Sequence, residues 1–148
     1  MSSQCRAAAL RLLKTRPRSI GEVEAKLEDK EFASGDIAEA VEYLKQLCLL
    51  DDRAFTVGWI RYRLARQFGF QRIIGELKEK GVEDGIITDA VAAAKQEYSE
   101  EAIAVALARR KAERLSGIDP LKRKKRVLDL LLRRGFPTNV AYKAIKEI

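Results

Sequence analysis

The sequence predicts an all-α protein of three tandem three-helix repeats, each a helix-turn-helix-like unit, stacked into an elongated, curved array. Two observations lead to this fold. Helix start and stop signals recur along the 148 residues while strand signals are nearly absent, and one apolar pattern is written three times. The composition agrees, because 47% hydrophobic and 34% charged residues supply a core and are not typical of a disordered chain.

The helix signals are local and specific. Ser19 and Glu22 have the spacing of a capping box, and Pro120 follows Asp119 as a first-turn proline behind its N-cap. Glycines stand where helices should stop, at Gly81, Gly117 and Gly135. These signals mark about nine helices. Three of them are leading helices, which we expect near residues 6–15, 53–68 and 100–115.

The apolar pattern has three leucine anchors, Leu27, Leu77 and Leu131, which lie 50 and 54 residues apart. Apolar residues recur at four fixed distances from each anchor. Four residues before it stand Val23, Ile73 and Val127, and five residues after it stand Phe32, Val82 and Phe136. Ten residues after it stand Ile37, Ile87 and Ala141, and fourteen after it stand Val41, Val91 and Ile145. Seven residues after each anchor the pattern predicts N-caps, at Ser34, Asp84 and Thr138. Periods of this size indicate repeats that bury a core by stacking, so we place them at residues 1–52, 53–98 and 99–148.

The net charge of +7 is distributed unevenly. Residues 1–52 carry 8 Lys and Arg against 10 Asp and Glu, residues 53–98 carry 8 against 6, and residues 99–148 carry 13 against 6. A basic excess toward the C-terminus predicts contact with a polyanion there.

Several functional classes are disfavoured. The chain has no histidine, no glycine-rich phosphate loop and no metal-ligand spacing, so we expect no enzyme activity, catalytic residue, cofactor or metal. No apolar run approaches the roughly 18 residues of a membrane span, and the N-terminus lacks a signal-peptide core. We therefore expect a soluble, cytoplasmic monomer.

Two features that could carry chemistry favour structural roles. Cys5 and Cys48 lack C-x-x-C spacing, and Cys48 falls on the apolar face of an expected helix, so we expect a buried structural thiol. Asp51 and Asp52 could form a metal-binding or catalytic pair. Their position before the helix that starts near Arg53 favours capping of that helix.

The candidate binding surface is basic. We expect phosphate contacts from a run on one helix, from two arginines about two turns later and from the adjacent helix: Lys122, Arg123, Lys124, Lys125, Arg126, Arg133, Arg134, Arg109, Arg110 and Lys111. A solvated helix face explains such a run, taken alone, equally well. In the middle repeat four arginines, Arg61, Arg63, Arg66 and Arg72, are interleaved with Trp59, Tyr62, Phe68 and Phe70. This pattern can hold single-stranded nucleic acid, although the spacing of Trp59 and Phe68 is more typical of a core.

The chain resembles the RecX family of RecA regulators nearly end to end. The resemblance lies in an ordered series of short stretches: Ala9-Leu10 to Arg16-Pro17-Arg18-Ser19, Leu47 to Leu50-Asp51-Asp52-Arg53-Ala54-Phe55, Trp59-Ile60-Arg61, Arg66, Gly69, Ile73-Ile74, Glu76-Leu77, Lys80-Gly81-Val82 and Arg133-Arg134-Gly135-Phe136. One departure is Lys30-Glu31-Phe32, where the family pattern looks like Lys-Gly-Phe. Glycine is common at that place because the helix ends with a positive φ.

This resemblance implies a protein that binds RecA along the groove of its filament on single-stranded DNA. Such a protein restrains filament growth, ATP hydrolysis, strand exchange and the co-protease activity that cleaves the SOS repressor, and so regulates recombination and DNA repair. The residues themselves indicate a long, basic, non-enzymatic helical array. They leave open an alternative, a stand-alone helix-turn-helix protein that reads duplex DNA without RecA.

Overall fold

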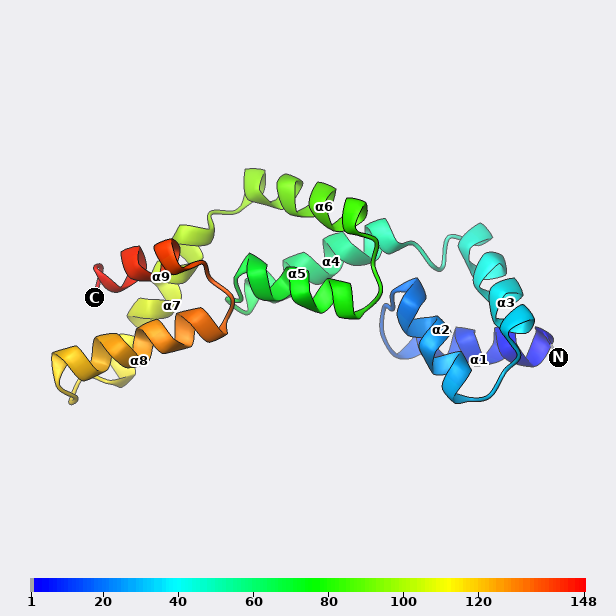
Figure 1. The fold of residues 1–148 in the computed structure, drawn as a ribbon, viewed down its shortest axis with the longest axis horizontal. Helices are drawn as coiled ribbons and strands as arrows, with labels where there is room; N and C mark the ends of the chain where they lie inside the picture. The colour runs from blue at the N-terminus through cyan, green and yellow to red at the C-terminus, as the bar shows by residue number, and fades with distance from the viewer. Residues whose placement is uncertain (1) are drawn as a thin grey trace. The chain divides into compact units, whose positions relative to one another are not determined.

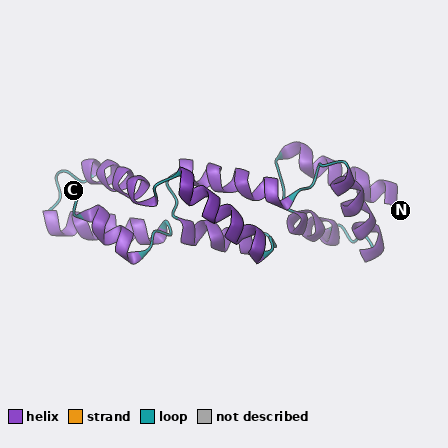
Figure 2. Ribbon diagram, turned by 90° about the horizontal axis from the view of Figure 1, so that it is seen from above, coloured by secondary structure: helices purple, strands orange, loops and turns teal. Residues whose placement is uncertain are grey.

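In this computed structural model, which describes residues 2–148, every regular element is an α-helix (Figures 1 and 2). The helices are α1 (Ser2–Thr15), α2 (Ile20–Asp29), α3 (Ser34–Gln46), α4 (Asp52–Ala65), α5 (Phe70–Glu79), α6 (Asp84–Glu97), α7 (Glu100–Arg114), α8 (Pro120–Arg133) and α9 (Thr138–Ile145). The predicted all-α class and its three-helix repeats are confirmed, with α1, α4 and α7 as the leading helices. Within the same residues no helix is long and apolar enough to cross a bilayer.

By its internal contacts the chain divides into two compact units. Unit 1 combines the described residues up to Gly58 with Leu77–Ala90, and unit 2 combines Trp59–Glu76 with Val91–Ile148. The middle repeat therefore contributes to both units. The repeat boundaries after residues 52 and 98 remain a prediction.

Each unit has a hydrophobic core built from the repeated apolar positions. In unit 1, α1, α2 and α3 pack together around Leu27 and Leu44, and in unit 2, α7, α8 and α9 pack around Leu131 and Phe136 (Figure 1). The three leucine anchors and the three residues four positions before them are fully buried, which confirms the predicted register. Leu27, Leu77 and Leu131 thus occupy equivalent buried positions in the three repeats.

The predicted N-caps of the third helices are wrong by one residue. Ser34, Asp84 and Thr138 are the first residues of α3, α6 and α9. Ala33 and Pro137 occupy the N-cap positions of α3 and α9, and neither makes a side-chain cap. Both have extended backbones, with ψ of 147° and 152°, because the tight turn leaves one extended residue before the helix resumes.

The predicted signals at α2 and α8 are confirmed. Ser19 and Glu22 form a reciprocal capping box at α2. At α8 the Asp119 carboxylate accepts from the backbone N–H of Lys122, and Pro120 occupies the first turn. Two kinds of cap therefore begin equivalent helices in different repeats.

The turn after the second helix of each repeat needs a left-handed residue. Gly81 and Gly135 have φ values of 77° and 91°, and Glu31 at the equivalent place has φ of 65°. The departure from glycine at residue 31 therefore changes the residue type and leaves the conformation intact. A residue with a Cβ pays roughly 1 kcal/mol for it.

The prediction of a buried thiol is correct for Cys5 and wrong for Cys48. Cys5 is completely buried in the core of unit 1, whereas Cys48 is exposed. Helix α3 ends at Gln46, and Cys48 has a left-handed φ of 58° beyond it. The helical periodicity that predicted an apolar-face position for Cys48 therefore does not apply at this residue.

Candidate nucleic-acid interface

Unit 1 contains a contact between the first repeat and the second. The Ser19 hydroxyl donates to the carbonyl oxygen of Lys80 at 2.6 Å, and the Ile20 N–H donates to the Asp52 carboxylate at 2.8 Å. The Lys80 ammonium pairs with the Glu22 carboxylate at 3.1 Å. A Cβ on Gly21 would lie 2.6 Å from the carbonyl oxygen of Lys80, so this approach requires glycine. We call residues 19–22 with Asp52, Lys80 and Gly81 the first junction.

Unit 2 contains the corresponding contact between the second repeat and the third. The Gly69 N–H donates to the carbonyl of Arg134 at 2.7 Å, and the Gln71 N–H donates to the carbonyl of Gly135 at 3.2 Å. The Phe70 N–H donates to the Glu100 carboxylate at 2.8 Å. Counted from the leucine anchors, Ser19 matches Gly69, Ile20 matches Phe70 and Lys80 matches Arg134. The two contacts are therefore copies of one another.

The charges at these matched positions differ. Where the first junction pairs Glu22 with Lys80, the second places Arg72 and Arg134. The Arg72 guanidinium donates to the carbonyl of Arg133 at 3.1 Å, and Arg134 donates to the carbonyl of Arg66 at 2.7 Å. We call residues 66–72, Glu100 and residues 133–135, with Arg63 and Arg110, the arginine junction.

The ring of Phe68 organises the arginine junction. The guanidinium carbons of Arg63, Arg134 and Arg72 lie 3.7, 4.4 and 4.8 Å from its centroid. Burial lowers the pKa of Arg134, and the positive charges of Arg110, Arg72, Arg63 and Arg133 lower it further. Arg134 stays protonated at neutral pH, in a field that is already strongly positive.

Arg63 is neutralised by a carboxylate of the same unit. Its guanidinium makes a two-pronged ion pair with Glu76, at 2.9 and 2.6 Å, and its side chain is 14% exposed. The indole N–H of Trp59 also donates to Glu76, at 3.1 Å. Trp59 and Phe68 are accordingly half-buried beneath arginines. They belong to a packed cation–aromatic cluster, as the core-like spacing of the two residues suggests.

The structure brings together six of the fourteen predicted binding residues: Arg63, Arg66, Arg72, Arg110, Arg133 and Arg134. Arg66 is exposed and lies over the exposed ring of Tyr62, 5.0 Å from its centroid. Arg61 is exposed on α4 and takes no part in these contacts, and Lys111 is half-buried on α7. Arg109 pairs with Glu147 at 3.5 Å. Among the residues described, Arg110, Arg133 and Arg134 have no carboxylate partner.

The remaining predicted residues, Lys122–Arg126, form a basic segment in the first half of α8. Counted from the anchor, they match residues 18–22 and 68–72, which make the two junctions. Helix α8 begins at Pro120, one turn earlier than α2 and α5 in this register, so the matching positions are helical. Three of the five residues are exposed and two are half-buried, and the segment ends about 10 Å along the helix axis before Arg133.

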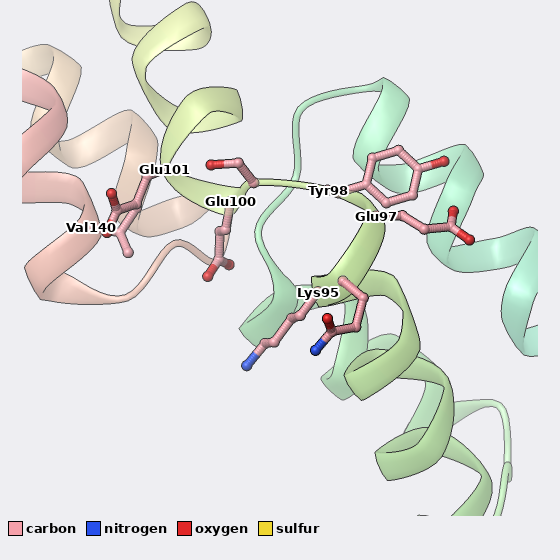
Figure 3. A pocket seen from close by; sticks show the side chains of 8 residues that line it. Lys95, Glu97, Tyr98, Glu100, Glu101 and Val140 are labelled. Carbon is pink, nitrogen blue, oxygen red and sulfur yellow. The ribbon is translucent and has the colours of Figure 1, made fainter.

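A hollow of about 600 Å³ lies around the connection from α6 to α7 in unit 2 (Figure 3). Lys95 and the carboxylates of Glu97, Glu100 and Glu101 line it. Glu100 is already bonded to Phe70, and the Lys95 ammonium lies 5.5 Å from the centre of the Phe70 ring. No group of three or more metal-ligating side chains occurs within residues 2–148. The lining of the hollow therefore mixes opposite charges, one of which is already hydrogen-bonded, and its polar groups do not converge on one point as they do in a ligand site.

The junctions escaped prediction from sequence, although a signal was present. The interpretation of Asp51–Asp52 as caps is confirmed for Asp51, whose carboxylate accepts from the N–H groups of Arg53 and Ala54. Asp52 instead caps α2 through Ile20, and its burial raises its pKa. An acidic residue that begins the leading helix recurs at Glu100, and this recurrence marks both junctions.

Comparison with known proteins identifies the repeats. Residues 5–44, 51–91 and 99–145 match the family profiles of the first, second and third three-helix domains of RecX. The chain belongs to the RecX family. It is 32% identical to the regulatory protein RecX of Mycobacterium sp. (strain JLS) over 143 residues, 93% of this chain and 78% of that protein. It is also 32% identical to that of Mycolicibacterium smegmatis, over 96% of this chain and 78% of the relative.

A solved structure supports the same assignment. RecX from Lactobacillus salivarius superposes with a TM-score of 0.80 at 27% identity, covering 99% of this chain and 95% of that one. In RecX terms, the first junction joins the first three-helix domain to the second, and the arginine junction joins the second to the third. The chain is thus a RecX-family regulatory protein whose junctions differ in charge.

Proposed function

We propose that this chain binds RecA and the RecA–single-stranded-DNA filament, and that it lowers the recombinase, ATPase and co-protease activities of RecA without catalysis of its own. Membership of a family whose members are named regulatory proteins supports this role. The observation that carries it is the arginine junction, where Arg110, Arg133 and Arg134 have no carboxylate partner within the described chain. Such a surface suits the phosphates of a nucleoprotein polymer.

The charge distribution suggests how contacts are divided. The first repeat is acidic by two charges, so it is suited to a protein surface. The arginine junction and the basic segment at Lys122–Arg126 would face DNA phosphates and acidic filament surface. Binding regulates the filament because the chain favours one filament state over another, since equal affinity for both would shift nothing.

The rival function, direct reading of duplex DNA by the helix-turn-helix units, fits the surface less well. A reading helix presents its exposed side chains to the major groove, which phosphates flank. The third helix of the first repeat exposes Glu42, and that of the second exposes Asp84 and Asp89. Carboxylates on these faces oppose a close approach to duplex DNA.

The decisive test is RecA ATPase activity on single-stranded DNA with this protein titrated in. We expect suppression. Suppression at substoichiometric ratios would indicate capping of filament ends, and suppression near one protein per few RecA protomers would indicate groove binding. Unchanged ATPase activity, together with a duplex gel shift that needs no RecA, would reject the proposal in favour of the rival.

The basic segment can be tested separately through counterion release. The double variant Lys124→Glu and Lys125→Glu should flatten the salt dependence of binding to the filament, by roughly 1.4 in log–log slope for two phosphate contacts. The matched control is Arg11→Glu with Lys14→Glu, two exposed residues of α1 in the acidic first repeat. Equal slopes for the variant and the wild type would remove the basic segment from the interface.

A further inference from the structure

The two junctions share a backbone geometry that does not require their difference in charge. In both, a backbone N–H of the earlier repeat is capped by a carboxylate that begins the next leading helix, Asp52 in one and Glu100 in the other, each at 2.8 Å. In the first junction a carboxylate, Glu22, also lies between two cations, Arg16 at 2.5 Å and Lys80 at 3.1 Å. The arginine junction has cations at the matching positions and lacks that carboxylate.

Arg72 is the residue that replaces the carboxylate. It matches Glu22 in register and contacts Phe68 beside Arg134, which matches Lys80. Because both guanidinium groups lie within 5 Å of one ring centre, they are closer together than the Debye length of about 10 Å at 0.1 M salt. Salt therefore screens their mutual repulsion only in part, and this repulsion opposes the backbone contact.

The repulsion has little compensation within unit 2. Glu76 pairs with Arg63 at 2.6 Å and lies 3.5 Å from Arg72, so one carboxylate serves two arginines. Glu100 accepts the Phe70 N–H. Arg110 and Arg133 add to the positive field at Arg134. The junction is thus a partly exposed cluster of planar, forked donors, in which a cation stands at the position that Glu22 holds in the first junction.

We propose that the arginine junction is a binding site for phosphodiester groups of a nucleic-acid backbone, and that a bound phosphate takes the place that the Glu22 carboxylate occupies in the first junction. The phosphate oxygens accept hydrogen bonds from Arg72 and Arg134 and neutralise their repulsion. Binding therefore fastens the start of α5 to the turn between α8 and α9. This inference rests on the proposed function for the choice of nucleic acid as the phosphate source, and its test contains no RecA.

The test measures amide hydrogen exchange in the full-length protein with and without a deoxythymidine oligonucleotide of about 12 nucleotides. The reporters are the Gly69 and Gln71 N–H groups, which close the arginine junction. The Ile20 N–H, which closes the first junction, is the internal reference. We expect saturating oligonucleotide to slow exchange at both reporters by roughly tenfold and to leave Ile20 unchanged.

The variant Arg72→Glu places a carboxylate in the arginine junction at the position that Glu22 holds in the first junction. It should slow exchange at Gly69 and Gln71 without DNA, and weaken oligonucleotide binding by roughly tenfold or more. Lys78→Glu, an equal charge change at an exposed residue of the same helix, is the matched control and should do neither. Arg72→Gln provides a second variant should Arg72→Glu fold poorly, and it should lose part of the affinity.

Several outcomes would overturn the proposal. Oligonucleotide binding that leaves Gly69 and Gln71 unprotected would place the DNA elsewhere, and unchanged affinity in Arg72→Glu and Arg72→Gln would remove the junction from the site. Inorganic phosphate that protects as well as the oligonucleotide would assign the site to a small anion. Polyglutamate that protects equally would assign it to an acidic protein surface.

Normal protection with no effect on RecA ATPase would sustain this site while rejecting the proposed function.

Discussion

The backbone of Gly69 meets that of Gly135 so closely that a Cβ on Gly69 would lie 2.5 Å from both the carbonyl carbon and the carbonyl oxygen of Gly135. This crossing carries the hydrogen bond from the Gly69 N–H to the carbonyl of Arg134, at 2.7 Å. A residue with a side chain cannot enter without separating the second repeat from the third. The arginine junction therefore depends on the absence of one methyl group.

Gly69→Ala should destabilise the protein by about 1–3 kcal/mol, because the added methyl group forces backbone atoms apart. Urea unfolding followed by circular dichroism measures the change. Gly75→Ala is the control, since Gly75 lies within α5 with nothing near its Cβ position, and it should stabilise the helix by about 0.5–1 kcal/mol. Equal stabilities for Gly69→Ala and the wild type would show that the crossing is not formed in solution.

Glu22 makes the first junction sensitive to acid. Burial would raise the pKa of its carboxyl, but hydrogen bonds from Arg16, the Ser19 backbone and Lys80 outweigh it and lower the pKa from 4.5 to about 2. A lowered pKa in the folded state stabilises the fold above pH 4.5, and this contribution is lost as the pH falls toward 2.

Glu22→Gln should therefore cost about 2 kcal/mol at pH 7, a figure reduced for the part of the carboxylate that water reaches. The deficit should shrink below pH 4.5 and vanish only below pH 2, where Glu22 is protonated in the folded state as well. Unfolding measured across this pH range checks the expectation, with Glu28→Gln, an exposed residue of α2, as the control. A deficit that does not depend on pH would mean that the ion pairs contribute nothing.

Glu31 holds a conformation that glycine holds in the other repeats. Glu31→Gly should raise the stability of unit 1 by about 0.5–1 kcal/mol, because relief of the left-handed backbone exceeds the entropy that glycine adds to the unfolded chain. Lys30→Gly is the control. Lys30 has φ of −83°, so glycine there relieves nothing and should lower stability. A loss of stability in Glu31→Gly would contradict the assigned strain.

The two thiols should differ sharply in reactivity. Cys48 is exposed, while Cys5 is buried, and burial together with the Asp36 and Glu39 carboxylates raises the pKa of Cys5. In the native protein Cys48 should react quickly with a disulfide reagent. Cys5 should react at least roughly 100-fold more slowly, because the reagent reaches it only when the core opens. Cys48→Ser should abolish the fast phase. A fast phase that survives in this variant would show that Cys5 is accessible.

The helices and their buried faces could be predicted because both follow from local order in the sequence. Capping residues and apolar spacing act over a few positions, so Leu27, Leu77 and Leu131 identify the same buried place in each repeat. Predictions failed where the chain leaves the helical period, as at Cys48 with its left-handed backbone. The third helices begin one residue earlier than the capping residues suggest, since Thr138 is the first residue of α9 and Pro137 holds the N-cap position.

The junctions could not be predicted because they join residues far apart in the chain. Ser19 and Lys80 are 61 positions apart, and nothing in the period of either helix shows that a hydroxyl and a carbonyl will meet. The basic residues were found from charge alone, which does not reveal pairing. Arg63 counts as a positive charge in the sequence, yet in the structure it is held inside by Glu76.

The middle repeat takes part in both junctions, since its Asp52 carboxylate accepts a hydrogen bond from the first repeat and its Phe70 N–H donates one to the third. Such a module could be duplicated without new chemistry at either end. The third repeat does not offer the matching N–H donor. Its early start at Pro120 places Lys124 inside a helix, and the Arg123 N–H already donates to the carbonyl of Asp119. That single extra turn places Lys122–Arg126 inside a helix, at the positions that form junctions in the other two repeats.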